Sequence, residues 1–152
     1  MADLVASVTS YFHAATPSEW YLGPVEVRLD REEILVTGSL APETDVPAFR
    51  EATRDQRVVI AAEAESRWGR AVSWAVDHGD HEHRFTTVSV PVMTRLRFDE
   101  RNILDTLIAG GIARSRSDAL GWCVRLVGQN ERAWLDELHH ATASIREVRD
   151  KG

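Results

Sequence analysis

The chain changes its periodicity near residue 98, and this change constrains the fold more than any other feature of the sequence. Before it, side chains alternate between two faces of an extended chain, with Val92, Thr94, Leu96 and Phe98 on one face and Met93, Arg95 and Arg97 on the other. After it, apolar residues recur at helical spacing, from an N-cap expected at Asp99 to the Gly110-Gly111 pair that ends the helix. The pattern therefore predicts one strand followed directly by one helix.

A second helix follows after a short link. Ser115 is the expected N-cap, Asp118 stands three residues later as in a capping box, and an apolar stripe runs through Cys123. One strand with two unpaired edges and two short helices cannot enclose a core of their own. A second copy resolves this, because two strands can pair into an antiparallel ribbon while four helices interlock beneath it. The segment therefore predicts a homodimer.

Residues 92–128 resemble the ribbon-helix-helix family of DNA-binding proteins, through RLRFDE, LDTLIAGG and SRSDAL in this order. The resemblance implies that the paired strands enter the major groove of double-stranded DNA, where arginine can bind guanine O6 and N7. It assigns base contacts to Met93, Arg95 and Arg97, and phosphate contacts to Ser115, Arg116 and Ser117. Free N–H groups and the helix dipole at a helix N-terminus independently favour a phosphate at the second of these places.

An unrelated α+β core is the alternative interpretation of the same segment. In that case the strand is an ordinary edge strand whose arginines are solvated. The two helices then form a hairpin that packs on the core and has no role in nucleic-acid binding.

The net charge of −6 is unusual for a DNA-binding protein, but the charge is unevenly distributed. Residues 1–89 hold 8 Arg against 15 Asp and Glu, whereas residues 90–130 hold 6 Arg against 4 acidic residues. Residues 131–152 hold 4 basic and 5 acidic residues. Positive charge is therefore concentrated in the segment that resembles the DNA-binding family, and specificity must come from base contacts rather than from overall attraction.

The fold class that we expect is α+β, with three parts. We expect residues 1–90 to form an α-ββ-α-ββ domain, with a helix over residues 2–14 and a hairpin over residues 25–40. Its expected role is sensing, dimerisation or partner binding. A long helix over residues 47–68 stops at Gly69, and a second hairpin turns at His78-Gly79 and returns over residues 85–90. Residues 91–130 are the ribbon-helix-helix unit, and residues 131–152 a C-terminal helix.

The C-terminal helix carries apolar residues at heptad-like spacing: Trp134, Leu138, Ala141, Ile145 and Val148. The pattern covers fewer than three heptads, which favours packing on the same protomer over a coiled coil. The alternative is that this helix extends the dimer interface or makes a tetramer contact.

Histidines gather at the turn of the second hairpin. His81 and His83 share one strand face and His78 lies across the turn, so imidazole nitrogens could hold a first-row divalent metal. Turns rich in His, Asp and Gly are also common as plain polar turns, and this is the favoured interpretation. Apart from that possible metal, the sequence predicts no cofactor.

Several classes of protein are disfavoured by the sequence. It contains no GxSxG, Walker, GxGxxG or HExxH motif, so we expect no enzyme. No apolar run approaches the ~18–20 residues of a membrane span, and the amino terminus lacks a basic region typical of secretion signals. Cys123 is the single cysteine, which we expect to be a core thiol in a reducing compartment. These features predict a cytoplasmic, nucleoid-associated bacterial protein without a membrane partner.

The function predicted from the sequence is that of a sequence-specific DNA-binding transcriptional regulator, most simply a repressor, that acts as a homodimer. Two alternatives stay open. One is an antitoxin, in which the ribbon binds its own promoter and another segment neutralises a toxin. The other is a module that keeps the ribbon-helix-helix unit for dimerisation alone.

Overall fold

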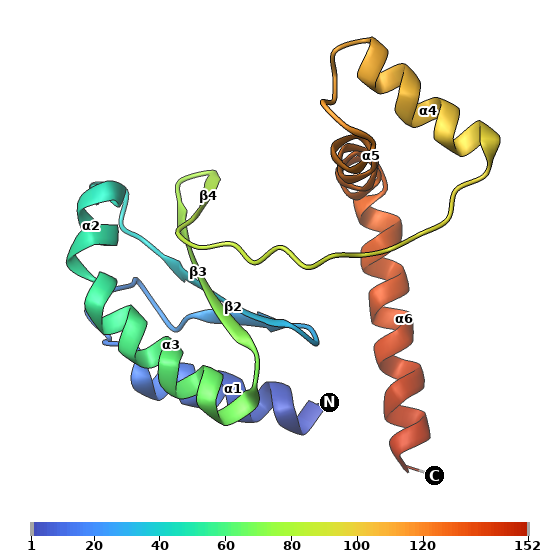
Figure 1. The fold of residues 1–152 in the computed structure, drawn as a ribbon. Coiled ribbons are helices and arrows are strands. Elements are labelled where there is room, and N and C mark those ends of the chain that lie inside the picture. Colours follow the sequence, from blue (N-terminus) through green and yellow to red (C-terminus); the bar gives the residue numbers. More distant parts are fainter. Residues whose placement is uncertain (1, 152) are drawn as a thin grey trace. The chain divides into compact units, whose positions relative to one another are not determined.

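The computed structural model describes the backbone of residues 2–151, with the side chains of residues 3–145, 148 and 149. The chain divides into two units, Met1–Val92 and Met93–Gly152, here called the N-terminal unit and the C-terminal unit. The described residues form six helices and one four-stranded sheet (Figure 1), so the fold is mixed α+β as expected.

The N-terminal unit contains the whole sheet and three helices. Its elements are α1 (Ala2–Ala15), β1 (Glu26–Leu29), β2 (Glu33–Ser39), α2 (Val46–Ala52), α3 (Arg54–Trp68), β3 (Ala71–His78) and β4 (His81–Arg84). The strand order is β1-β2-β3-β4. Pairing is antiparallel at both ends of the sheet and parallel between β2 and β3, where α2 and α3 make the crossover connection.

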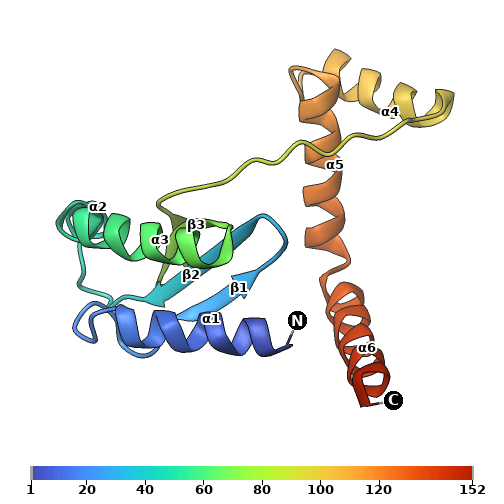
Figure 2. The same cartoon turned by 60° about the horizontal axis from the view of Figure 1, so that its bottom comes forward.

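Two helices of this unit pack side by side along the sheet (Figure 2). The hydroxyl of Tyr11 on α1 donates to the carbonyl oxygen of Ile60 on α3 at 3.1 Å, and the Tyr11 ring meets that of Trp68 edge-to-face. Phe12 on α1 reaches the sheet and contacts Trp74 on β3, with ring centroids 5.8 Å apart. The cluster formed by these helices and alternate strand residues holds twelve buried apolar side chains, so this unit encloses its own core.

The other face of the sheet is covered by charged side chains from the two edge strands. Arg28 on β1 pairs with Glu82 on β4 at 3.0 Å, and Arg84 pairs with the same carboxylate at 2.8 Å. Small side chains lie on the central strands beneath them, including Ser73, which is completely buried. Burial acts to raise the pKa of Glu82, but the hydrogen bonds and charges of Arg84 and Arg28 together outweigh it and lower the pKa. Among the described elements of the N-terminal unit, this face therefore carries ion pairs and no helix layer.

The long helix predicted over residues 47–68 is interrupted at Thr53. The Thr53 hydroxyl donates to the Phe49 carbonyl oxygen at 2.9 Å and accepts from Arg57 Nε at 3.0 Å. The residue ends α2 and begins α3, which continues to Gly69. Gly69 has φ of 63°, a left-handed conformation that favours glycine, so the predicted end of the helix is confirmed.

The first hairpin is confirmed, but the return strand of the second was predicted too late. It lies at β4, and residues 85–90 form no strand. The backbone N–H groups of Phe85 and Thr86 both donate to the Trp74 carbonyl oxygen, at 2.8 and 3.4 Å. The Trp74 N–H donates to the Thr86 hydroxyl instead of a backbone carbonyl. Phe85 and Thr86 thus both lie opposite Trp74, as in a β-bulge, and the pairing of the two strands ends there.

The C-terminal unit consists of three helices, α4 (Phe98–Ala109), α5 (Arg116–Asn130) and α6 (Arg132–Lys151). The N-cap of α4 is Arg97 rather than the predicted Asp99, because the Glu100 carboxylate accepts from the Arg97 backbone N–H at 2.6 Å. The N-cap of α5 is Ser115 as predicted, and its hydroxyl accepts from the Asp118 N–H at 3.1 Å. Gly111, with φ of 74°, lies in the link between these helices.

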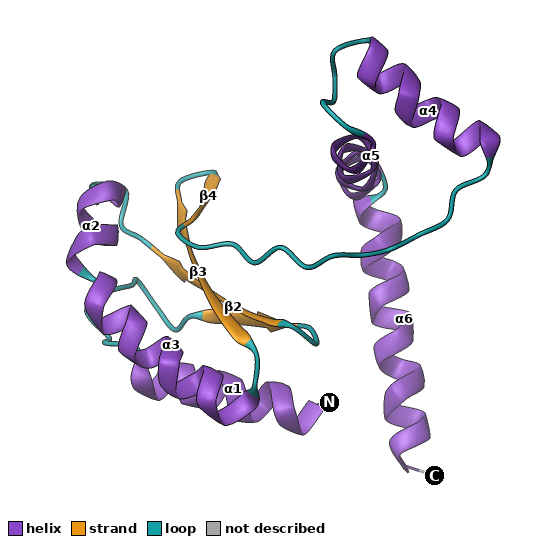
Figure 3. Ribbon diagram, viewed as in Figure 1, coloured by secondary structure: helices purple, strands orange, loops and turns teal. Residues whose placement is uncertain are grey.

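Residues 92–98 do not form the strand that the alternation predicts. In the described chain, residues 86–97 are loop without regular secondary structure (Figure 3). A strand needs hydrogen bonds from a neighbour, and the four strands of the sheet pair only with each other. The two-stranded ribbon is thus not a feature of the single chain.

None of the described helices is both long enough and apolar enough to cross a lipid bilayer.

Candidate nucleic-acid interface

The arginine segment, residues 92–97, is exposed over most of its length. Met93 is 99% exposed, and Arg95 and Arg97 are exposed as well. Leu96 is half-buried and packs against the small core of the C-terminal unit. Met93, Arg95 and Arg97 are therefore accessible as predicted, and Leu96 faces the protein.

Val92 and Phe98, which the alternation also assigns to the inner face, lie outside that core. They are 86% and 71% exposed, respectively. Of the four residues of the predicted inner face, Leu96 is the one that packs against the described buried cluster, while Phe98 is the first residue of α4. The inner face is thus largely uncovered.

The guanidinium groups of Arg95 and Arg97 form no ion pair with any described side chain. The backbone around them is held in place by other residues. Arg101 Nη1 donates to the Leu96 carbonyl oxygen at 2.7 Å, and Glu100 binds the Arg97 N–H. Two hydrogen bonds thus hold the backbone of the segment at Leu96 and Arg97, and two guanidinium groups have no ion pair. This arrangement is suited to a negatively charged partner.

The predicted phosphate site at the start of α5 has a more restricted geometry. The Ser115 hydroxyl is already used by the Asp118 N–H. Arg116 donates twice to the Asp105 carboxylate on α4, from Nε and Nη2 at 2.8 Å each. This bidentate hydrogen bond lowers the pKa of Asp105 and raises that of Arg116. Asp105 was not predicted as a site residue, because its contact with Arg116 depends on how α4 and α5 pack.

Two donors nevertheless remain at this end of α5. The N–H groups of Arg116 and Ser117 belong to the first helical turn, where no carbonyl of the same helix is in reach. Both residues are exposed. The site that the structure offers to an anion consists of backbone amides, while the Arg116 side chain ties α5 to α4.

The C-terminal unit buries few apolar side chains. Its cluster holds three buried residues, Leu104, Ala113 and Ala119, with Cys123 among the partly buried residues around them. Many large apolar side chains stay exposed: Phe98, Ile103, Ile112, Val124, Leu126, Val127, Trp134, Leu138, Ile145 and Val148. The expected packing of the C-terminal helix on its own protomer is not observed, because four of these residues lie on α6. Such a surface is typical of an incomplete core that a partner covers.

The three histidines of the second hairpin lie near one another, but not as a metal site. His78 and His81 are paired across β3 and β4, and the ring of His83 lies 6.2 Å from that of His78. His78 Nε2 makes a hydrogen bond of 2.9 Å with the Pro42 carbonyl oxygen. Among the described residues, no group of three His, Cys, Asp or Glu side chains is arranged to hold a metal ion.

Two family models match the chain, one in each unit. Residues 6–84 match the model described as "Rv1265-like protein, N-terminal domain", which covers more than half of the chain. The chain belongs to the Rv1265-like family. Residues 97–149 match the model described as "Mb1296 C-terminal domain". Most of the arginine segment therefore lies between the two matches, and the helices α4 and α5 lie within the second.

The chain has relatives in two mycobacteria. The chain is 43% identical over 159 residues to the uncharacterized protein Mb1296 of Mycobacterium bovis and to the uncharacterized protein Rv1265 of Mycobacterium tuberculosis. Each alignment covers 97% of this chain and 70% of the relative. No solved structure matches the chain.

Proposed function

We propose that this Rv1265-like protein is a sequence-specific DNA-binding transcriptional regulator, most simply a repressor, that acts as a homodimer. In the proposed complex, the arginine segments of two copies pair as an antiparallel ribbon of the ribbon-helix-helix kind and enter the major groove. The observation that carries the proposal is the exposed arginine segment itself. It holds two unpaired guanidinium groups and lies directly before a pair of helices that lacks a complete core.

The need for a second copy follows from the C-terminal unit. Three buried side chains are too few to stabilise three helices, because two of them are alanines and a fully buried leucine contributes only about 1.5–3 kcal/mol. Pairing two copies would satisfy the backbone groups of the arginine segment and cover Val92 and Phe98. Dimerisation and formation of the ribbon are therefore one event in this proposal.

The spacing of the two arginines suits the reading of neighbouring bases. In a strand, residues two apart lie on the same face and are separated by about 6.6 Å. Successive base pairs are about 3.4 Å apart, so Arg95 and Arg97 span roughly two base steps. Each guanidinium can donate two hydrogen bonds to guanine, and the adjacent Met93 can contact the methyl group of thymine.

Phosphate contacts are proposed for the amides at the start of α5 rather than for the Arg116 side chain. The Arg116 guanidinium is held by Asp105, whereas the N–H groups of Arg116 and Ser117 have no partner in their own helix. A phosphate bound there would fix the position of each protomer along the DNA, while the ribbon reads the sequence.

The proposal is tested by selecting binders from a randomised pool of DNA duplexes. The full chain is compared with the Arg95→Ala/Arg97→Ala variant. A control variant, Arg125→Ala/Arg132→Ala, removes the same charge from α5 and α6. We expect the native chain and the control to enrich one two-fold-repeated site, and the test variant to enrich none. Equal, weak and salt-sensitive binding by all three would overturn the proposal in favour of a dimerisation module.

A further inference from the structure

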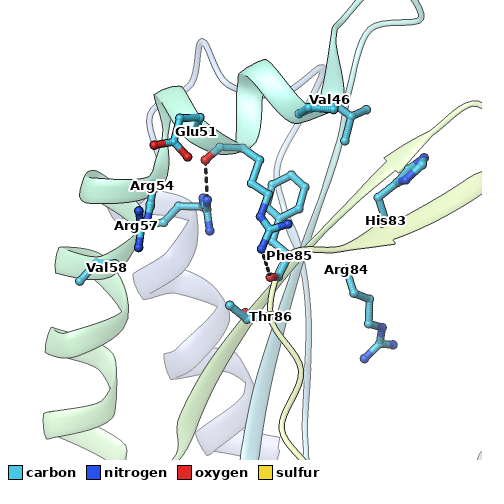
Figure 4. A pocket seen from close by; sticks show the side chains of 11 residues that line it. Val46, Glu51, Arg54, Arg57, Val58, His83, Arg84, Phe85 and Thr86 are labelled. Atoms are coloured by element: carbon cyan, nitrogen blue, oxygen red, sulfur yellow. Dashed lines mark hydrogen bonds between the residues drawn. The ribbon is translucent and has the colours of Figure 1, made fainter.

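The N-terminal unit contains a pocket of about 870 Å³ between α2, α3 and the residues at the end of β4. Figure 4 shows Arg54, Arg57 and Val58 on its helical side and His83, Arg84 and Phe85 on its strand side. Glu51 is the single acidic side chain in its lining. The basic side chains that line it are Arg50, Arg54, Arg57, Arg84 and His83. A strongly basic pocket is unexpected in a unit whose sequence is acidic overall.

The break at Thr53 places three of these arginines together. Arg50 is in the last turn of α2, and Arg54 and Arg57 are in the first turns of α3. Because Thr53 binds both the Phe49 carbonyl oxygen and Arg57 Nε, the two helices meet at the rim of the pocket. The break between the two helices therefore places Arg50, Arg54 and Arg57 around one pocket.

Arg57 is a buried cation without an anionic partner. It is only 5% exposed. Its Nη2 donates to the Arg50 carbonyl oxygen at 2.7 Å, and its guanidinium lies 4.8 Å from the centre of the Phe85 ring. No described carboxylate forms an ion pair with it. Burial lowers its pKa below the usual value of arginine, and the nearby Arg50 and Arg54 add to this effect, while Tyr21 and Glu51 oppose it.

The remaining charged groups leave the pocket short of negative charge. Arg50 Nη2 donates to the Phe85 carbonyl oxygen at 3.0 Å, and Arg54 is exposed, and neither has an ion pair among the described side chains. Arg84 is paired outside the pocket with Glu82. Arg50, Arg54 and Arg57 therefore have no described carboxylate partner, and Glu51 is the one acidic side chain in the lining of the pocket. A buried charge without a counter-charge is costly, so an anion in this pocket would stabilise the unit.

We propose that the pocket binds a small organic molecule that carries a phosphate group. Guanidinium groups bind phosphate through paired hydrogen bonds, and three of them here lack a carboxylate partner. The walls also include Val46, Pro47, Val58 and Phe85, which suit an apolar portion of the ligand. The volume lies in the range of ligand pockets, about 300–1,000 Å³. Because Arg57 is buried, a free phosphate ester reaches it more readily than the backbone of a DNA duplex does.

This site goes beyond the proposed DNA-binding function and does not depend on it. All of its residues lie in the N-terminal unit, whereas the proposed DNA contacts lie in the C-terminal unit. If both proposals hold, the N-terminal unit is the part of the regulator that binds an effector.

Calorimetry of the full chain with phenyl phosphate and with inorganic phosphate tests the proposal. We expect phenyl phosphate to bind, and more tightly than inorganic phosphate because of the apolar walls. Arg54→Ala should weaken phenyl phosphate binding by about tenfold, the equivalent of one lost charge-assisted contact. Arg31→Ala, which removes a charge from the exposed turn between β1 and β2, is the matched control and should bind as the native chain does.

Three outcomes would overturn the proposal. Equal weakening by Arg54→Ala and Arg31→Ala would mean that binding reports net charge alone. Equal binding of citrate and phenyl phosphate would mean that the pocket has no preference for phosphate. Displacement of phenyl phosphate by a short DNA duplex would mean that the basic pocket is a nucleic-acid surface. Arg54 is exposed, so its replacement leaves the fold intact.

Discussion

The two units of the chain differ in how far each completes itself. The N-terminal unit buries twelve apolar side chains in one cluster, and ion pairs cover the other face of its sheet. The C-terminal unit buries three and leaves large apolar residues exposed on every helix. The contrast supports the proposal that the second unit associates with another copy, because large apolar side chains of its helices stay exposed in the single chain.

The arginines of the two units differ in the same way. In the N-terminal unit, Arg57 is buried beside Phe85 and lines a pocket. In the C-terminal unit, Arg95 and Arg97 are exposed on a segment without regular secondary structure. The first arrangement suits a small ligand that enters the protein, and the second suits a large partner that the protein contacts at its surface.

The largest expected effect is the loss of stability in the self-contained unit. Trp74 is 2% exposed and contacts Phe12 and Trp20, so Trp74→Ala should lower the free energy of unfolding by about 3–5 kcal/mol. This loss should be the same at every protein concentration, because the core lies within one copy. Urea unfolding at two protein concentrations measures it. A loss below about 1 kcal/mol would contradict the assignment of the core.

The C-terminal unit should behave differently. Leu104 is its largest buried side chain, and Leu104→Ala should lower the free energy of unfolding of this unit by about 2–5 kcal/mol. In the native chain, the stability of this unit should rise with protein concentration, because only the folded form of the unit can dimerise. Hydrogen exchange of the α4 and α5 amides at two concentrations measures this. Equal protection at both concentrations would break the comparison between the units.

Several elements were predicted correctly because their causes are local. The Ser115 cap, the end of α3 at Gly69 and the β1–β2 hairpin each depend on residues close in sequence. The parallel pairing of β2 with β3 was not predicted, since it depends on how the crossover helices pack on the sheet. The break at Thr53 also escaped prediction, because its cause is the choice of hydrogen-bond partners by one hydroxyl group.

The candidate sites show the same limit of sequence analysis. The exposure of Met93, Arg95 and Arg97 followed from the alternation, but the strand that they were assigned to needs a partner that one chain does not provide. The basic pocket joins residues from two helices and a strand end, so no single pattern marks it. The spacing of Arg50, Arg54 and Arg57 was a signal, although it also fits a solvated helix face.

A smaller effect concerns alkaline pH and the N-terminal core. Burial raises the pKa of Tyr21 to about 12, with Arg57 opposing it. The folded state therefore holds this proton more tightly than the unfolded state, whose tyrosine has a pKa near 10. The stability from this group is complete below pH 10 and is lost as the pH rises toward 12, by about 1 kcal/mol at pH 11. Tyr21→Phe should remove this part of the pH dependence.

The Tyr21 hydroxyl is buried without a hydrogen-bond partner among the described residues, so Tyr21→Phe should leave stability at neutral pH nearly unchanged. Urea unfolding of both proteins between pH 8 and pH 11 separates the two effects. If the variant lost stability in parallel with the native chain above pH 10, Tyr21 would not be the titrating group.

The smallest expected effect concerns Asp105, which holds the Arg116 guanidinium at the start of α5. Asp105→Asn should free this cation and raise the affinity for DNA of any sequence by up to about fivefold at low salt. Fluorescence anisotropy with a random duplex measures the change. An unchanged affinity would place the start of α5 away from the phosphate backbone.

The central claim is that two copies of the arginine segment form one DNA-reading ribbon. Sedimentation of the full chain with a duplex enriched by selection tests it most directly, because it gives the stoichiometry and the affinity together. The account predicts two chains, or a multiple of two, per site, and a complex that Arg95→Ala/Arg97→Ala abolishes while the free dimer persists. One chain per site, or an equally tight complex with the variant, would contradict it.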